Sequence, residues 1–209
     1  MPVEYPPTSE IIAEIEDIEK NIADEMAELK KLLEQKDSKN ARIVEMDGKK
    51  IVVINDIRFK GKREDWKDVE QYLKEYVGEF YEIEESSDKV FISKDFPDEF
   101  ANSESRIALK GAVAKAKANA SQVVPDLIRI ATNKRHSENT KEKHRFDAKY
   151  GWYRYDVRFA LPVYNDKADR IERYNVFRST MLVRHADDNE KYLYDFIAIK
   201  KEMSSPLEP

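Results

Sequence analysis

The chain has 209 residues, of which 41% are hydrophobic and 38% are charged, with a net charge of −5. This length holds one domain of ordinary size, or one domain with a small appendage. Because there is no cysteine, the sequence excludes disulfides, a thiolate nucleophile and cysteine-ligated metal. Three well-spaced histidines give little support for a zinc site, and we expect no metal and no cofactor.

Signals for export or membrane insertion are not recognisable in the sequence. Residues 1–25 lack a basic region followed by an apolar block, and no apolar run of about 18 residues occurs. We therefore expect a soluble cytoplasmic protein with no membrane partner.

The N-terminal segment carries the excess of acidic charge and predicts a long helix. Residues 1–40 hold eleven acidic and five basic residues, whereas the remainder has a balance of +1. Thr8 or Ser9 can cap a helix that runs to about Lys36. Its apolar residues are three or four positions apart, which predicts a coiled-coil-like stripe from Ile11 to Leu33 over residues 1–38. Such a stripe needs a partner, which is a second copy of the chain, its own domain or a larger protein.

Residues 41–100 predict a small ββαββ unit that ends in an acidic, aromatic linker. Asp47-Gly48 between two apolar segments is a strong hairpin signal, and Gly78 is placed to end a helix. The carboxylates of the linker at 95–100 more often solvate a turn than bind a cation. The expected elements are strands 41–46 and 49–59, a helix 66–77, and strands 79–84 and 90–93.

Residues 101–209 predict two helices packed on an antiparallel sheet. The first helix runs from Ser103 or Ser105 to about Ala120, and Pro125 starts the second. Arg106, Lys110 and Lys117 share one face of the first helix by their spacing. Short connections between alternating strands indicate a meander, so the fold class is α+β. The expected strands are 152–164, 171–185 and 191–200.

The stretch 134–164 concentrates basic, aromatic and imidazole groups, a combination that suits a nucleic acid. We expect a polar, basic loop that leads into the strand 152–164. Alternation in that strand places Trp152, Arg154 and Arg158 on one face and Tyr155 on the other. The aromatic residues are typical of a sheet core as well as of a base-stacking surface.

The sequence from Ala41 to Glu208 also resembles a known family. The resemblance rests on the strings FPDEF, LKG, AKAKANA, ATNK, DAKYGWYRY, RFALPVY, RYNVF, RHADD and KYLYD. They are similar to the barnase/EndoU/colicin/RelE-like nuclease domains of phages and integrative elements of Gram-positive bacteria. The resemblance implies a barnase/RelE-like fold and metal-independent cleavage of RNA, tRNA included, in the cytoplasm of a bacterial host cell.

Residue types suggest roles for such a reaction. Imidazole titrates near neutral pH, so His144 and His185 are candidates for the base and the acid, and Arg158 is a candidate to hold the phosphate. The candidate nucleic-acid contacts are Lys110, Lys117, Lys143, Trp152, Arg154 and Tyr155. Two other functions remain open. One is a non-catalytic anti-defence or regulatory protein that binds nucleic acid or protein, and the other is a structural phage component that oligomerises through Ile11–Leu33.

Overall fold

The computed structural model of the chain describes residues 40–165, 167 and 170–205, and from the N-terminal segment Thr8, Ile11, Ile12, 15–22 and 24–26. Residues 1–39 form one unit and residues 40–209 another. The described residues of the first unit are all helical, and their apolar side chains are exposed. The rest of the predicted helix, Leu33 included, lies outside the described residues, so association through this stripe stays a prediction.

The hairpin predicted around Asp47-Gly48 is confirmed. Strands β1 (Ala41–Met46) and β2 (Lys49–Ile54) pair antiparallel. Asp47 and Gly48 have φ angles of 54° and 68°. Two consecutive residues with positive φ give the tight turn whose twist matches that of the flanking strands.

The predicted helix and second strand pair are confirmed as well. Helix α2 (Asp65–Leu73) continues into the 3-10 turn Lys74–Tyr76, and Gly78 beyond it has a φ of 92°. The next strands, β3 (Phe80–Glu82) and β4 (Lys89–Phe91), pair antiparallel.

The segment expected to be an acidic linker is a helix, α3 (Phe96–Asn102). Pro97 lies in its first turn, where a missing backbone N–H has no helical partner to lose. Phe96 and Phe100 are four residues apart and are both buried. Burial of this aromatic pair outweighs the local polarity that suggested a linker.

The helix expected over residues 103–120 is interrupted. Ser103 caps α4 (Glu104–Ile107) by accepting the backbone N–H of Arg106, and α5 (Gly111–Ala120) starts afterwards. Gly111, the first residue of α5, has a φ of 56°, which is outside the right-handed helical region, so the helix of α4 cannot continue through it. The predicted stripe of three cations is therefore broken. After the 3-10 turn Ser121–Val123, α6 (Val124–Arg129) has Pro125 in its first turn, as expected.

The C-terminal strands β6 (Trp152–Tyr164), β7 (Ile171–His185) and β8 (Lys191–Ser205) form the predicted meander. β6 pairs with β7, and β7 pairs with β8, both antiparallel. An unpredicted strand, β5 (Thr132–Ser137), pairs with β6 from within the stretch expected to be a loop. A 3-10 turn, Glu142–His144, follows it.

The described strands belong to one eight-stranded sheet in the order β1-β2-β6-β7-β8-β4-β3, with β5 also pairing β6. β2 is parallel to β6 and β4 is parallel to β8. The two N-terminal hairpins thus lie at opposite ends of the sheet. The expectation that residues 41–100 form a separate ββαββ unit is therefore wrong, because both predicted domains contribute strands to the same sheet.

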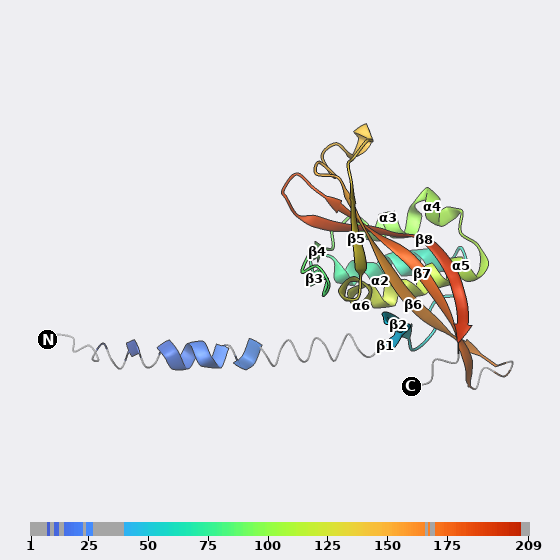
Figure 1. Ribbon diagram of the computed structural model, residues 1–209, viewed down its shortest axis with the longest axis horizontal. Coiled ribbons are helices and arrows are strands. Elements are labelled where there is room, and N and C mark those ends of the chain that lie inside the picture. The colour runs from blue at the N-terminus through green and yellow to red at the C-terminus, as the bar shows by residue number, and fades with distance from the viewer. Residues whose placement is uncertain are drawn as a thin grey trace. The chain divides into compact units, whose positions relative to one another are not determined.

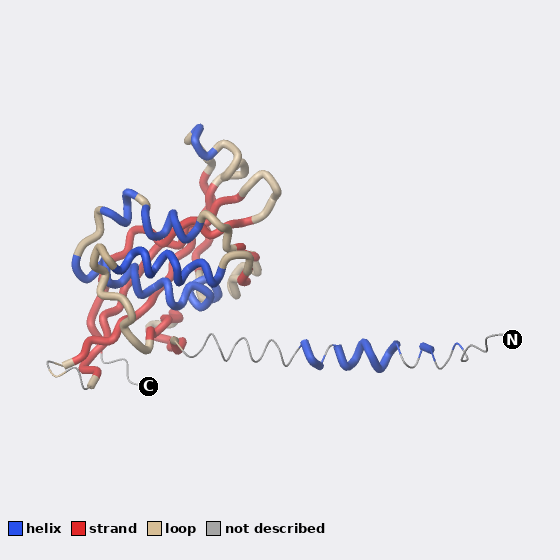
Figure 2. Tube along the Cα trace, turned by 180° about the vertical axis from the view of Figure 1, so that it is seen from behind, coloured by secondary structure: helices blue, strands red, loops and turns tan. Residues whose placement is uncertain are grey.

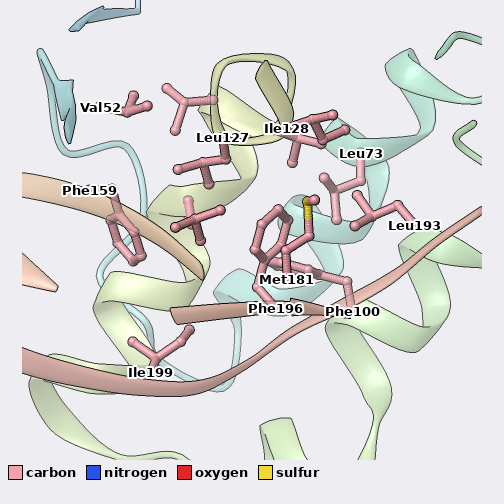
Figure 3. Close-up of a cluster of buried hydrophobic side chains, with 14 of the residues drawn as sticks. Val52, Leu73, Phe100, Leu127, Ile128, Phe159, Met181, Leu193, Phe196 and Ile199 are labelled. Carbon is pink, nitrogen blue, oxygen red and sulfur yellow. The ribbon is translucent and has the colours of Figure 1, made fainter. Parts of the chain in front are cut away.

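The helices cover one face of this curled sheet, and the fold is α+β (Figures 1 and 2). Side chains from α2, α3, α5 and α6 pack there against alternate residues of the meander, among them Phe100, Leu127, Phe159, Met181 and Phe196 (Figure 3). We call the opposite face, which carries Trp152, Arg154 and Arg158, the open face. Within the described part of the chain, no helix is both long and apolar enough to cross a membrane.

Candidate functional site

The three candidate catalytic residues do not come together. The His144 ring packs edge-on against Trp152, with ring centroids 5.2 Å apart, whereas the His185 ring lies 5.8 Å from that of Tyr153. Trp152 and Tyr153 are consecutive in β6, so the two imidazoles are on opposite sides of the sheet. Arg158 is six positions beyond Trp152, about 20 Å along the strand.

The environment of His144 is that of a packed side chain. Its ring contacts Tyr194 as well as Trp152, and both contacts are edge-to-face. The Nδ1 atom is buried and makes no hydrogen bond with the described residues, and its nearest acid is Asp147, 3.5 Å from Nδ1 to Oδ2. His185 is more open, with Nε2 3.1 Å from Asn189 Oδ1. Neither imidazole faces the phosphate-binding candidate Arg158.

Three predicted nucleic-acid contacts, Trp152, Tyr155 and Lys117, are buried, and that prediction is wrong for their side chains. Lys117 is 1% exposed, and its Nζ lies 2.6 and 2.9 Å from the carboxylate oxygens of Asp195. Burial lowers the pKa of Lys117 and raises that of Asp195 to about 6. The ammonium therefore neutralises an acid beneath the sheet and does not reach solvent.

Tyr155 belongs to a second buried polar cluster, centred on Asp88. The Tyr155 hydroxyl donates to Asp88 Oδ2 at 2.7 Å, and Lys134 and Lys191 each place Nζ within 2.9 Å of the same carboxylate. Burial raises the pKa of Asp88, but the hydrogen bonds from Lys134, Tyr155, Lys191 and Ser86 outweigh it and hold the pKa well below its usual range. This cluster ties four segments together and was not predicted, because its members are far apart in the sequence.

The remaining predicted contacts are on the surface. Lys110 is exposed, just before α5, and Arg154 on the open face donates to Ser137 Oγ at 2.5 Å. The side chain of Lys143 lies outside the described residues.

A cavity of about 870 Å³ opens where β6 changes partner. β5 pairs with β6 as far as Asp156, and β2 pairs with it from Phe159 onward. Val157 and Arg158, between these ladders, have no strand partner on this side among the described residues. The cavity is lined by charged and polar side chains together with the apolar Ile130, Ala131, Val157 and Ala198, and by no aromatic ring of the described chain. Its cationic side chains are Lys49, Lys50, Arg129, Arg158, Arg178 and Lys200.

Two backbone irregularities border this cavity. Asn133 has a φ of 57° at the register shift of β5, and Ala198 has a φ of 52° at a register shift of β8. Bulges bend a strand and redirect its side chains, and a non-glycine residue with positive φ carries a conformational cost. Asn133 and Ala198, the two residues that carry this conformational cost, both line the cavity.

Three cations lie in register across the cavity floor. Arg158 on β6 is paired with Arg178 on β7, which is paired with Lys200 on β8. Directly paired residues project from the same face, and like charges in that position disfavour the sheet. We call these three residues the cation row. It lies on the open face, and its register could not be read from the sequence.

The acids around the cavity leave most of the cation row uncompensated. Glu202 accepts from Arg158 Nε at 2.8 Å. Asp156 is held by Arg135, whose hydrogen bonds lower the Asp156 pKa, and Glu84 is paired with Lys50. Arg178 and Lys200 have no ion pair or hydrogen bond from their side chains within the described chain.

The described residues contain no cluster of three or more acidic or histidine side chains that could hold a metal ion. Comparisons of the chain with protein-family models, with curated proteins and with solved structures find no significant match. The site is therefore interpreted from its own geometry and charge.

Proposed function

We propose that this protein binds RNA by holding its phosphodiester backbone in the cavity, against the cation row of Arg158, Arg178 and Lys200. The observation that carries the proposal is the in-register alignment of three cations, of which only Arg158 has an ion pair within the described residues. A bound phosphate replaces mutual repulsion by charge-assisted hydrogen bonds, and the planar guanidinium fork matches two phosphate oxygens.

The lining of the cavity favours backbone recognition over base readout. Within the described residues its walls offer charged groups, hydroxyls, one amide and aliphatic side chains, but no aromatic ring on which a base could stack. The cavity volume of about 870 Å³ is in the range of sites that hold drug-sized ligands. A short segment of single-stranded RNA therefore fits inside it. The resemblance of the sequence to RNA-cleaving domains favours RNA over DNA.

Imidazole-dependent cleavage of that RNA gains no support from the geometry. A general base must lie within hydrogen-bond reach of the proton that it removes, and His144 and His185 are remote from the cation row. The proposed activity is therefore binding. A metal-independent ribonuclease remains a sequence-based prediction.

The test is an RNA titration at several salt concentrations with charge-removing variants. Arg178→Gln and Lys200→Gln remove one charge each from the cation row. Arg173→Gln and Lys201→Gln are matched controls, because both are exposed and neither lines the cavity. Lys201 is also paired with Phe177, whose side chain packs in the helix-covered core, so it projects from the opposite face to Lys200.

We expect each cation-row variant to weaken binding and to reduce the salt slope by about one phosphate contact, while both controls match the wild type. Equal losses in all four variants would show nonspecific attraction and refute the site. The same incubations in EDTA, run on a gel, reveal whether the RNA is cleaved.

A further inference from the structure

The loop between β5 and β6, residues 138–150, exposes two aromatic side chains. Phe146 is 70% exposed and Tyr150 is 45% exposed. Phe146 is the most exposed large apolar side chain of the described chain. The loop projects from one end of the sheet (Figure 1).

The inner side of this loop is firmly packed on the open face. His144 and Ala148 are buried against Trp152, and the His144 carbonyl accepts hydrogen bonds from Asn139 Nδ2 and from the Ala148 backbone, both at 2.9 Å. Gly151 closes the loop with a φ of 92°, at a point where a Cβ atom would lie 2.5 Å from the Ser137 carbonyl oxygen. Phe146 is therefore exposed although residues on either side of it are buried and hydrogen-bonded.

A cation accompanies each exposed ring. The Arg145 guanidinium carbon lies 5.8 Å from the centroid of Phe146, and Lys149 Nζ lies 5.3 Å from that of Tyr150. Aromatic rings beside cations are the combination with which proteins bind single-stranded nucleic acid, because bases stack on the rings while cations attract the phosphates.

The loop and the cavity are joined along β6. Arg154 lies on the same strand face as Trp152, which the loop covers, and as Arg158 in the cavity. Arg154 lies between Trp152 and Arg158 along the strand. The open face therefore carries a cation between the loop and the cavity.

We infer that Phe146 and Tyr150 stack bases of the RNA strand whose backbone occupies the cavity. This inference rests on the proposed function and adds a second contact site to it. The cation row recognises phosphate, whereas the two rings recognise the bases, so binding requires a strand long enough to extend from the cavity to the loop.

The experiment compares four probes: oligoadenylate, oligouridylate of the same length, inorganic polyphosphate with the same number of phosphates, and vesicles rich in phosphatidylserine. The variants are Phe146→Ala and Tyr150→Ala, each in the full chain. Phe80→Ala is the matched control, because Phe80 is 50% exposed, has Lys89 Nζ 5.3 Å from its ring centroid and lies on β3, at an end of the sheet.

We expect either loop variant to weaken oligoadenylate binding about fivefold to a hundredfold, the range for loss of one stacked base. The loss of affinity for oligouridylate should be smaller than that for oligoadenylate, because uracil stacks more weakly than adenine. Polyphosphate binding should not change, and Phe80→Ala should match the wild type with every probe. Because both loop side chains are exposed, unchanged urea unfolding checks that the variants are folded.

The outcomes separate this inference from the proposed function. Unchanged oligoadenylate binding in both loop variants, with Lys200→Gln still impaired, overturns the inference and leaves the cavity site intact. A wild type that binds neither oligonucleotide nor polyphosphate refutes both. If the loop variants instead lose binding only to vesicles rich in phosphatidylserine, the rings contact a membrane surface and the inference is wrong.

Discussion

The buried pair of Lys117 and Asp195 gives a quantitative test of the structure. Their side chains are 1% and 3% exposed, and Lys117 also lies 4.8 Å from the ring centroid of Phe100. In Lys117→Met the packing volume is nearly kept, but the Asp195 carboxylate loses its cation. Removing one partner of a buried pair costs about 3–5 kcal/mol, a large part of the stability of an ordinary domain.

The pH dependence of this loss follows from the Asp195 pKa. Burial already raises that pKa to about 6, and without Lys117 it rises further. A raised carboxyl pKa means that the folded state keeps a proton that the unfolded chain has released, so stability falls as pH rises through this window. Lys117→Met should therefore be most destabilised relative to wild type at pH 8, and the difference should shrink at pH 5.

The assay is urea unfolding at both pH values, followed by tryptophan fluorescence. The double variant Lys117→Met/Asp195→Val is the control, because it replaces both charges by apolar groups. It should recover most of the loss, since hydrophobic replacement of a buried pair is commonly neutral or stabilising. A single-variant loss below about 1 kcal/mol at pH 8, or one independent of pH, would contradict the burial of this pair.

Three further predictions concern other parts of the fold. Asp88→Asn should destabilise the protein by about 2–3 kcal/mol at pH 7. Because the Asp88 pKa is lowered in the folded state, wild-type stability should fall as pH drops below about 4, and thermal unfolding from pH 6 to 2 should show a shallower fall in the variant. Gly151→Ala should cost more than Gly78→Ala, about 1–2 kcal/mol for the latter, in urea unfolding. Both glycines have a φ of 92°, but only Gly151 lacks room for a Cβ atom; equal losses would contradict the close packing. Arg178→Thr should stabilise the unbound protein by about 0.5–1 kcal/mol while weakening RNA binding, and a loss of stability would show that the cation row is not repulsive.

Local patterns were sufficient for much of the fold. The alternation in 152–164 and 171–185 predicts β6 and β7 with the bounds that the structure has, and Asp47-Gly48 predicts the first hairpin. β5 was missed because its sequence, TNKRHS, has no apolar alternation, and it is a strand only because β6 offers an edge to pair with. Such an edge is not visible in a local window of sequence.

The candidate site was harder to predict because it depends on distant partners. Lys117 was expected to be exposed, since nothing near it in the sequence compensates its charge. In the structure it is buried, because Asp195, 78 positions away, forms an ion pair with it. Alternation correctly placed Arg154 and Arg158 on one strand face. The alignment of Arg158 with Arg178 and Lys200 required the register of three strands, which side-chain patterns do not specify.

The strand order has a consequence for the sequence of folding events. Among the described strands, the hairpin β1-β2 joins the sheet only at β6, and β4 joins it only at β8. During synthesis, residues 41–91 emerge long before residues 152–205, so neither hairpin finds its neighbouring strand until most of the chain has been made. These contacts between distant segments predict slow folding that is completed only after the meander has formed.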